Sequence, residues 1–177
     1  WGAARRVTPA AGEPAWGPVL HFDARTSELW LFFAVSHHNC TSPKRADWKS
    51  PGGDLVAQRS SDGGRSWGTR QTLLTAEAVR SRRKGSPAPL VTANKLCVLP
   101  ATVSAPEQWL LPFWTESRGA CGSTDGDFSA ILVSRDAGKT WDVLGPVYRP
   151  EETWLIEPSL AFDPLSGLLV QLWRTRL

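Results

Sequence analysis

The chain has 177 residues and a mass of 19.4 kDa. Its 41% hydrophobic and 21% charged residues are typical of a globular domain and exclude a disordered chain. The net charge is only +3, and no apolar stretch approaches the ~20 residues that a membrane span needs. The one basic run, made of Arg80, Arg82, Arg83 and Lys84, lacks interleaved aromatic residues. This argues for a solvated loop and against nucleic acid as a partner.

Ten Trp, 15 Gly and 14 Pro residues stand beside one Tyr and no Met. High contents of Gly, Pro and Trp argue against a helical bundle and favour short strands joined by tight turns. Because the chain begins at Trp1 and lacks Met, we expect a processed segment or a fragment of a longer chain.

Apolar or β-branched runs alternate with turn residues along the chain, and no segment has a helical period. We predict strands over 18–22, 28–35, 55–57, 71–74, 89–91, 95–99, 108–115, 130–133, 143–144, 155–162 and 168–174. Asn94 is expected to form a turn between two of these strands, and two polar insertions occupy 37–53 and 118–127. The pattern predicts an all-β fold.

One eight-residue pattern, S-x-D-x-G-x-[S/T]-W, occurs twice, and we call each copy an octad. The specified residues are Ser60, Asp62, Gly64, Ser66 and Trp67 in the first octad, and Ser134, Asp136, Gly138, Thr140 and Trp141 in the second. Agreement at every specified position indicates an internal repeat.

The residue types of the octad are those of a hairpin turn. The Asp side chain can accept hydrogen bonds from backbone N–H groups, and Gly supplies a positive φ at no steric cost. The Ser or Thr hydroxyl can bond back across the loop, and the Trp ring can pack on neighbouring strands. None of these roles needs a substrate, so we interpret Asp62 and Asp136 as turn formers rather than catalytic acids.

The spacing of the two octads, from Ser60 to Ser134, is longer than the ~40–50 residues of common propeller repeats. It fits a four-stranded blade that carries a long insertion. At ~40–75 residues a blade, the chain would form roughly two and a half to three blades, fewer than the four that a closed propeller needs. We therefore expect part of a ring whose sheet edges are covered in the complete protein.

The octad resembles the Asp-box, or bacterial neuraminidase repeat, of sialidases. Three further stretches are similar to sialidase-like repeats: 13–20 with 29–33, then 111–116, and 156–160 with 167–174. The resemblance covers nearly the whole chain and implies an incomplete six-bladed β-propeller of four-stranded antiparallel blades over residues 1–177. Asp-boxes also occur in propellers that are not sialidases, so they identify the fold better than the activity.

The resemblance implies a role for two charged residues. Sialidases use a Tyr nucleophile, a Glu that accepts the Tyr proton, an Asp acid/base and three Arg residues that clamp the substrate carboxylate. Glu157 matches the Glu of the nucleophile pair, and Arg174 matches the second clamp Arg. The planar guanidinium fork suits a carboxylate.

The hairpin around the turn 163–167 places Glu157 and Arg174 equally far from its centre. In a regular hairpin the two side chains would be cross-strand neighbours on one face, although a bulge would shift this register. The surrounding sequence is apolar, so we expect a setting in which unpaired charges are costly. The structural alternative is a plain ion pair worth ~0.2–1 kcal/mol.

Other candidates have weaker support. Glu116 either lines the pocket or caps a surface turn, and Trp48 either stacks on a sugar or is buried. Arg176 shares the face of Arg174 by strand parity and is read as structural. His37 and His38 supply too few ligands for a metal site, so we expect no metal and no cofactor.

The cysteines leave the compartment open. Cys40, Cys97 and Cys121 allow at most one disulfide within the chain and lack the spacing of a metal site. The sequon Asn39-Cys40-Thr41 favours a secreted or lumenal location, but such triplets also arise by chance.

The leading hypothesis is a segment of a sialidase-like glycoside hydrolase that cleaves terminal sialic acid, or a related acidic sugar, from a glycan substrate. The resemblance assigns the remaining catalytic groups to blades outside this chain, since its only Tyr, Tyr148, does not match the nucleophile. We therefore expect the isolated segment to be inactive. The alternatives are a non-catalytic Asp-box propeller that binds glycans or proteins, and a glycosidase of the same fold with another sugar specificity.

Overall fold

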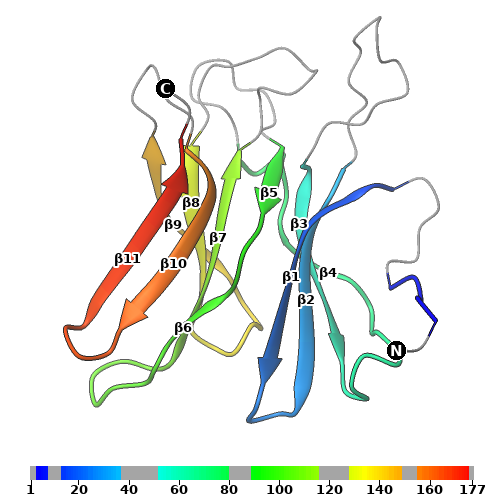
Figure 1. Cartoon of the computed structure of the whole chain (residues 1–177), viewed down its shortest axis with the longest axis horizontal. Helices are drawn as coiled ribbons and strands as arrows, with labels where there is room; N and C mark the ends of the chain where they lie inside the picture. The colour runs from blue at the N-terminus through cyan, green and yellow to red at the C-terminus, as the bar shows by residue number, and fades with distance from the viewer. Residues whose placement is uncertain are drawn as a thin grey trace, which may run out of the picture.

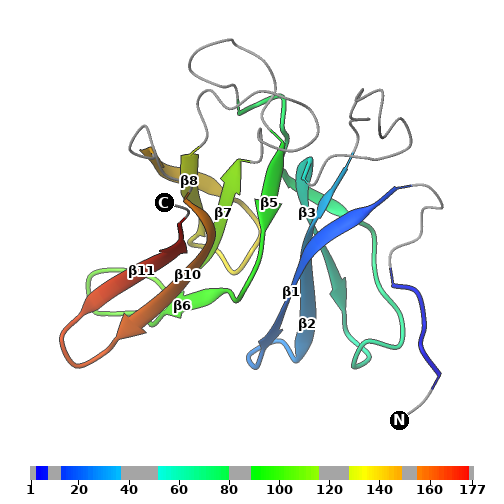
Figure 2. The same cartoon turned by 45° about the horizontal axis from the view of Figure 1, so that its top comes forward.

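The computed structural model describes residues 3–7, 13–36, 52–79, 89–115, 128–148 and 155–175, and all helix or strand elements in these ranges are strands (Figures 1 and 2). They are β1 Ala15–Asp23, β2 Glu28–Val35, β3 Asp54–Ser60, β4 Gln71–Leu74, β5 Leu90–Thr92, β6 Cys97–Leu99, β7 Gln108–Thr115, β8 Phe128–Ser134, β9 Asp142–Tyr148, β10 Ile156–Asp163 and β11 Leu168–Arg174. The limits of β2, β7 and β11 are those predicted from the sequence.

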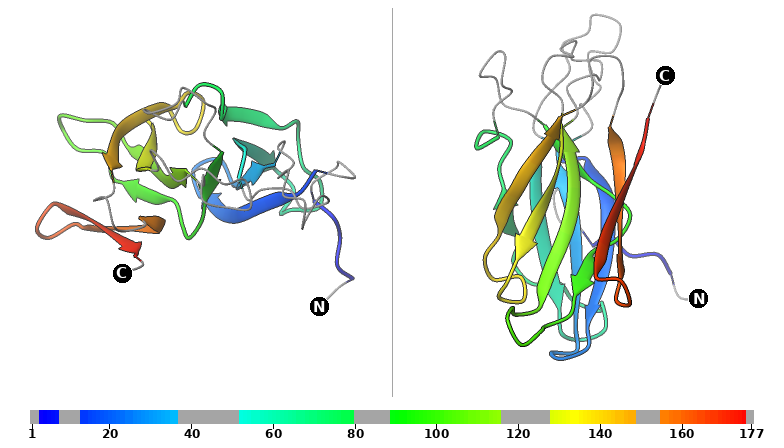
Figure 3. Two further views of the ribbon diagram at one scale, coloured as in Figure 1. Left: turned by 90° about the horizontal axis from the view of Figure 1, so that it is seen from above. Right: turned by 90° about the vertical axis from the view of Figure 1, so that its left-hand side faces the viewer.

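The strands form two sheets and a separate hairpin, all antiparallel. The first sheet has the order β1-β2-β3-β4, and the second has the order β5-β7-β8-β9, with β6 also paired to β7. The β10–β11 hairpin lies beside the second sheet, next to β6 and β7 (Figure 3). The all-β class and an antiparallel four-stranded sheet are thus confirmed. The described strands do not close into a ring, so the number of blades stays a prediction.

The two sheets share one apolar core, and β2 of the first sheet is buried on both of its faces. Side chains of a strand alternate between its faces, so Trp30 and Phe32 point into the core shared with β7 and β8. Leu31 and Phe33 lie on the opposite face in a smaller cluster. The nearly continuous apolar sequence of β2 reflects this burial on both sides.

The hairpin topology separates the molecule into two ends. The octads follow β3 and β8, at the same end as the β1–β2 and β10–β11 turns, at the bottom of Figure 1. Glu157 and Arg174 lie at the other end, where β10 begins and β11 stops. The candidate site residues are therefore placed away from the octads.

The β1–β2 and β10–β11 hairpins are a second internal repeat, which was not predicted from the sequence. In each, an Asp carboxylate accepts a hydrogen bond from the backbone N–H two residues later: Arg25 donates to Asp23 at 3.0 Å and Leu165 to Asp163 at 3.0 Å. A left-handed residue closes each turn, Ser27 with φ 57° and Gly167 with φ 71°. The sequence signal is the shared pattern P-x-L-x-F-D, which begins at Pro18 and Pro158.

The repeat includes an irregularity in the first strand of each hairpin. The register of β1 shifts between Trp16 and Val19, and that of β10 shifts between Ile156 and Ser159. In each bulge the residue before the proline has a positive φ. It is Gly17 with φ 59° in β1, and Glu157 with φ 52° in β10. Proline suits a bulge because it has no N–H to donate to the ladder.

Candidate functional site

Glu157 and Arg174 are in direct contact. The Nη1 of Arg174 donates a hydrogen bond to the Oε1 of Glu157 at 2.7 Å. The side chain of Arg174 is 63% exposed and that of Glu157 is 41% exposed, so the pair lies at the surface and water screens it. As a stabilising ion pair it is worth about 0–1 kcal/mol.

The hairpin that carries the pair differs from the expected one in its register. Ile156, and not Glu157, pairs with Arg174, and the next pair joins Ser159 to Leu172. Glu157 and Pro158 of β10 therefore both lie opposite Trp173 of β11. This is a β-bulge, in which two residues of one strand face one residue of its partner. The side chains meet despite the bulge because Arg174 is long enough to reach the displaced carboxylate.

The sequence predicts an apolar setting in which unpaired charges are costly, but in the described residues the pair and most of β11 are exposed to water. Leu169, Val170 and Leu172 are 38%, 47% and 68% exposed. They belong to β11, whose residues are largely exposed while Ile156 and Leu160 of β10 are buried. Alternation and hydrophobicity predict a strand, but they cannot say which strands cover it.

The pair combines a carboxylate that can accept a proton with a guanidinium that can hold an anion. Arg has five N–H donors in one plane. Among the described residues, Arg174 forms one ion pair, through its Nη1. Its other N–H donors remain available to a planar anion such as a carboxylate. Together the two groups could bind an acidic ligand and accept a proton beside it.

Asn94 holds the backbone of the bulge. Its Nδ2 donates to the carbonyl oxygen of Glu157 at 3.0 Å and to that of Pro158 at 2.9 Å. Just before the bulge, the side chain of Ile156 is buried against Val91 and Trp114 of the second sheet. The predicted turn at Asn94 is present, and Asn94 itself has a φ of 69°. The sequence contained no signal for its contact with Glu157, because the two residues are far apart in the chain.

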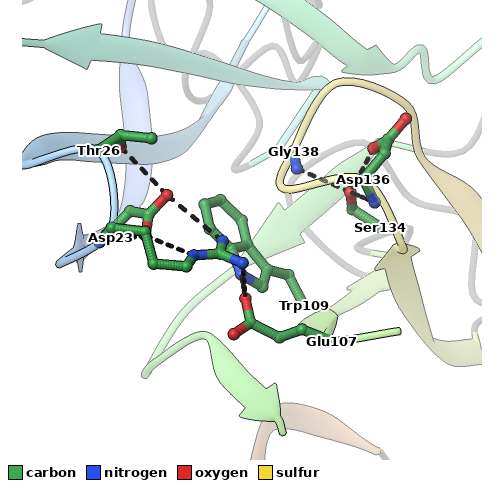
Figure 4. Close-up of polar contacts among 8 residues, drawn as sticks. Asp23, Thr26, Glu107, Trp109, Ser134, Asp136 and Gly138 are labelled. Atoms are coloured by element: carbon green, nitrogen blue, oxygen red, sulfur yellow. Dashed lines mark hydrogen bonds and ion pairs between the residues drawn. The ribbon is translucent and has the colours of Figure 1, made fainter. Parts of the chain in front are cut away.

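The octads form tight turns in which the Asp and Ser side chains bond to each other and to the backbone. In the second octad, Ser134 donates to Asp136 at 2.8 Å and accepts from the N–H of Gly138 at 2.8 Å (Figure 4). Thr140 donates to Asp136 through its N–H at 2.9 Å and through its hydroxyl at 2.5 Å.

The first octad repeats this arrangement. Ser66 donates to Asp62 through its N–H at 2.8 Å and its hydroxyl at 2.6 Å, and Ser60 donates to Asp62 at 2.8 Å. Hydrogen bonds from the residue four positions later lower the pKa of Asp62 well below its usual value and lower that of Asp136 to about 2. Carboxylates so strongly held in the charged form make poor general acids, which supports a structural role.

A charged network that was not predicted from the sequence joins the two sheets at the octad end (Figure 4). Arg25 forms an ion pair with Asp23 at 3.1 Å and another with Glu107 at 2.9 Å. The indole N–H of Trp109 donates to the same Glu107 oxygen at 2.9 Å. Burial next to Trp109 lowers the pKa of His21. Because Asp23, Arg25, Glu107 and Trp109 are all partnered within the network, it is best explained as a link between the sheets.

Several predicted residues lie outside the described ranges. They are Glu116, Arg176, His37, His38, Trp48, Asn39, Cys40, Cys121, the basic run 80–84 and most of both insertions. Cys97 is described; it is buried and unpaired, and burial raises its thiol pKa. Among the described residues no cluster of His, Cys, Asp and Glu could hold a metal ion. Those residues also include no helix with the length and hydrophobicity needed to cross a bilayer.

The sequence profile of the BNR repeat-like domain matches residues 1–175. The chain therefore belongs to the BNR repeat-like family. No curated protein is significantly similar in sequence.

Two solved structures show the same fold at low sequence identity. A protein of unknown function from Dyadobacter fermentans matches with a TM-score of 0.63 and 19% identity, over 92% of this chain and 44% of that one. The Hadza microbial sialidase Hz136 matches with a TM-score of 0.53 and 17% identity, over 84% of this chain and 26% of that one. The chain thus spans less than half of either structure.

Proposed function

We propose that this chain is part of a sialidase-like glycoside hydrolase that acts on terminal sialic acid or a related acidic sugar. Its two sheets would be blades of a six-bladed propeller, and residues 1–177 would form an incomplete share of that domain. Arg174 would bind the sugar carboxylate, and Glu157 would accept the proton of a nucleophilic Tyr. Membership of the BNR repeat-like family and the similarity to a sialidase structure support the proposal.

The observation that carries the proposal is the comparison of equivalent positions in the two hairpins. The bulge residue is Gly17 in β1 and Glu157 in β10. The partner of the residue before the bulge is Ala34 in β2 and Arg174 in β11. The same backbone thus forms with two small residues or with a charged pair, so the hairpin itself does not require the charges. In this proposal, ligand chemistry accounts for the charges at both positions.

The proposed roles follow from charge and geometry. A guanidinium binds a carboxylate through two parallel hydrogen bonds, which fixes the orientation of an acidic sugar. A carboxylate beside a phenol can accept its proton and so make a neutral Tyr nucleophilic. In this proposal the Tyr, the acid/base Asp and the other two Arg residues come from remaining blades.

The test is cleavage of a fluorogenic sialoside by a natural chain that contains this segment and further repeats. We expect Glu157→Gln to lower kcat by about 10²–10⁴-fold, because it removes the proton acceptor. Arg174→Ala should chiefly raise KM. The isolated 177 residues should not cleave the sialoside.

A matched control uses another exposed ion pair at the opposite end of the molecule. Arg135, a variable position within the second octad, donates to Asp142 at 3.0 Å, and Arg135→Ala should leave both kcat and KM unchanged. Normal kcat in the Glu157→Gln variant would overturn the proposed role of Glu157. Cleavage by the isolated segment would overturn its dependence on further blades.

The alternative is a non-catalytic propeller that binds acidic glycans or proteins. Its support is that Tyr148, the only Tyr of the chain, belongs to β9 at the edge of the second sheet farthest from β5. In that case the longer chain would bind a sialylated oligosaccharide without cleaving it, and Arg174→Ala would weaken the binding. Turnover of the sialoside would exclude this alternative.

A further inference from the structure

Glu157 has a backbone conformation that its side chain does not favour. Its φ of 52° lies in the left-handed region, where a Cβ atom crowds the following carbonyl oxygen. Glycine avoids this crowding, and Gly17 occupies the equivalent position in β1. A residue with an unfavourable φ persists only where its surroundings fix it.

The surroundings of Glu157 include an amide from another sheet. In a regular strand, successive carbonyl groups point to opposite edges, so one donor group cannot reach two in a row. The bulge turns the carbonyls of Glu157 and Pro158 to the same side, where the Nδ2 of Asn94 donates to both, at 3.0 Å and 2.9 Å. An amide nitrogen has two hydrogens, so each carbonyl can receive one.

Asn94 is suited to this position by its own backbone. It lies between β5 and β6 with φ 69°, and Asn is one of the few residues with a side chain that tolerates the left-handed region. The same segment also contacts the other bulge. A Cβ atom placed on Gly17 would lie 1.6 Å from the carbonyl oxygen of Thr92. The segment from Thr92 to Asn94 thus contacts both bulges, but it holds only the Glu157 bulge with a side-chain amide.

We infer that Asn94 is a positioning residue, whose amide fixes the β10 bulge so that the Glu157 carboxylate faces Arg174. The inference deepens the proposed function and rests on it. Asn94 touches only backbone carbonyls of the bulge, so it would act through Glu157 and not on the sugar. In this arrangement, the second sheet controls the alignment of the pair on the neighbouring hairpin.

The main test variant is Asn94→Gly, which keeps the preference for a positive φ and removes the amide. Asn94 is exposed, so its loss leaves no buried side-chain group unpaired, and the variant should fold. Asn94→Asp is the second variant. It tolerates the same φ and has almost the same size, but it sets an acceptor oxygen against the two carbonyls. The control is Ser27→Gly, at another left-handed turn residue, in the β1–β2 hairpin.

The first readout is the nitrogen-15 NMR signal of the Arg174 guanidinium in the 177-residue chain, which needs no substrate. An ion pair slows rotation of the guanidinium, so wild type and Ser27→Gly should show separate Nη signals. In Glu157→Gln the guanidinium should rotate freely and give one averaged Nη signal, and both Asn94 variants should do the same. Separate Nη signals in the two Asn94 variants, as in the wild type, would overturn the inference.

The second readout is sialoside cleavage by the longer chain. Misplacing a catalytic group by about 1 Å can cost about 10²-fold in rate, so we expect Asn94→Gly to lower kcat by roughly that factor. KM should stay near the wild-type value because the clamp residue itself is unchanged. A normal kcat in Asn94→Gly, in a protein that Glu157→Gln inactivates, would overturn the inference and leave the proposed function intact. Normal kcat in Glu157→Gln would instead overturn the proposed role of Glu157, and the NMR readout would still decide whether Asn94 fixes the pair.

Discussion

The two octads share the hydrogen bonds of their Ser and Asp side chains but have different surroundings. Gly138 of the second octad lies against Trp30 and Trp109 in the core between the sheets. In the first octad, the nearest side-chain atoms to a Cβ placed on Gly64 belong to Leu29 and Trp67, at 3.6 and 3.8 Å. The octad sequence therefore specifies the turn, whereas the neighbouring strands determine how much each copy contributes to stability.

The Trp residues of the octads show the same difference. The indole N–H of Trp141 donates to the carbonyl of Gly138 at 3.1 Å, and its ring meets Phe32 edge to face at 5.7 Å. The ring of Trp67 packs on the outer cluster around Leu31 and Phe33, and its buried N–H has no partner among the described residues. An octad can therefore keep its turn while its Trp faces either the inner or the outer side of a sheet.

The largest expected effect comes from adding one methyl group to each octad glycine. A Cβ on Gly138 would lie 2.6 Å from the Cη2 of Trp30 and 3.0 Å from the Cζ3 of Trp109, and both rings are confined by the core. Overpacking and left-handed strain together should lower the free energy of unfolding of Gly138→Ala by about 2–4 kcal/mol. Gly64→Ala introduces only the left-handed backbone strain, so its free energy of unfolding should fall by about 1 kcal/mol.

Urea denaturation of both variants at neutral pH measures this contrast. Equal losses of unfolding free energy in the two variants would contradict it, because the local backbone strain is common to both glycines, with φ of 83° and 85°.

A smaller effect is expected from Trp→Phe substitutions. Trp141→Phe removes the hydrogen bond to Gly138 and leaves that carbonyl without its indole donor, at a cost of about 1–2 kcal/mol. Trp67→Phe removes a buried N–H that has no described partner, which offsets the loss of ring contacts, so its net effect should be close to zero. Thermal unfolding of both variants is the measurement. A Trp67→Phe variant less stable than Trp141→Phe would show that ring packing outweighs the indole hydrogen bond.

Much of the fold could be predicted from the sequence because its determinants are local. Gly, Pro, Asn and Asp at the turns delimit β2, β7 and β11, and the octad residues encode their own hydrogen bonds. A regular hairpin about the turn at 163–167 predicts the contact of Glu157 with Arg174, and the two side chains do meet, but across a bulge that shifts the register. Local pattern therefore predicted the strands and turn of this hairpin but not its bulge.

The remaining features depend on partners far apart in the chain. The left-handed Glu157 is stabilised by Asn94 from another sheet, and nothing near Pro158 predicts that contact. The exposure of Leu169 and Leu172 depends on which strands cover β11, and hydrophobicity alone does not determine this. A comparison of Pro18 with Pro158 could have revealed the bulge, because Gly17 at the equivalent position marks a positive φ.

The smallest expected effect is the response of the octads to acid. Hydrogen bonds from Ser66 and Thr140 lower the pKa values of Asp62 and Asp136 in the folded state, that of Asp136 to about 2. An acid with a lowered folded-state pKa stabilises the fold above its unfolded pKa of about 3.9, and this contribution is lost as the pH falls toward the folded value. Because Asp136 is near the surface, its contribution at neutral pH should be at most about 1 kcal/mol.

Unfolding free energies measured between pH 6 and pH 2 for wild type, Asp62→Asn and Asp136→Asn test the acid response. Wild type should lose stability below about pH 4, and each variant should lose less over that interval, since one titrating group is gone. Asp23 and Asp163 also have lowered pKa values, so a residual slope should remain in both variants. The two octads differ in the burial of their Gly and in the cluster against which their Trp packs, but they share the Asp hydrogen bonds, so both substitutions should flatten the pH profile. If only one of the two substitutions flattened the pH profile, the surroundings of each octad, and not only its shared hydrogen bonds, would control the pKa of its Asp.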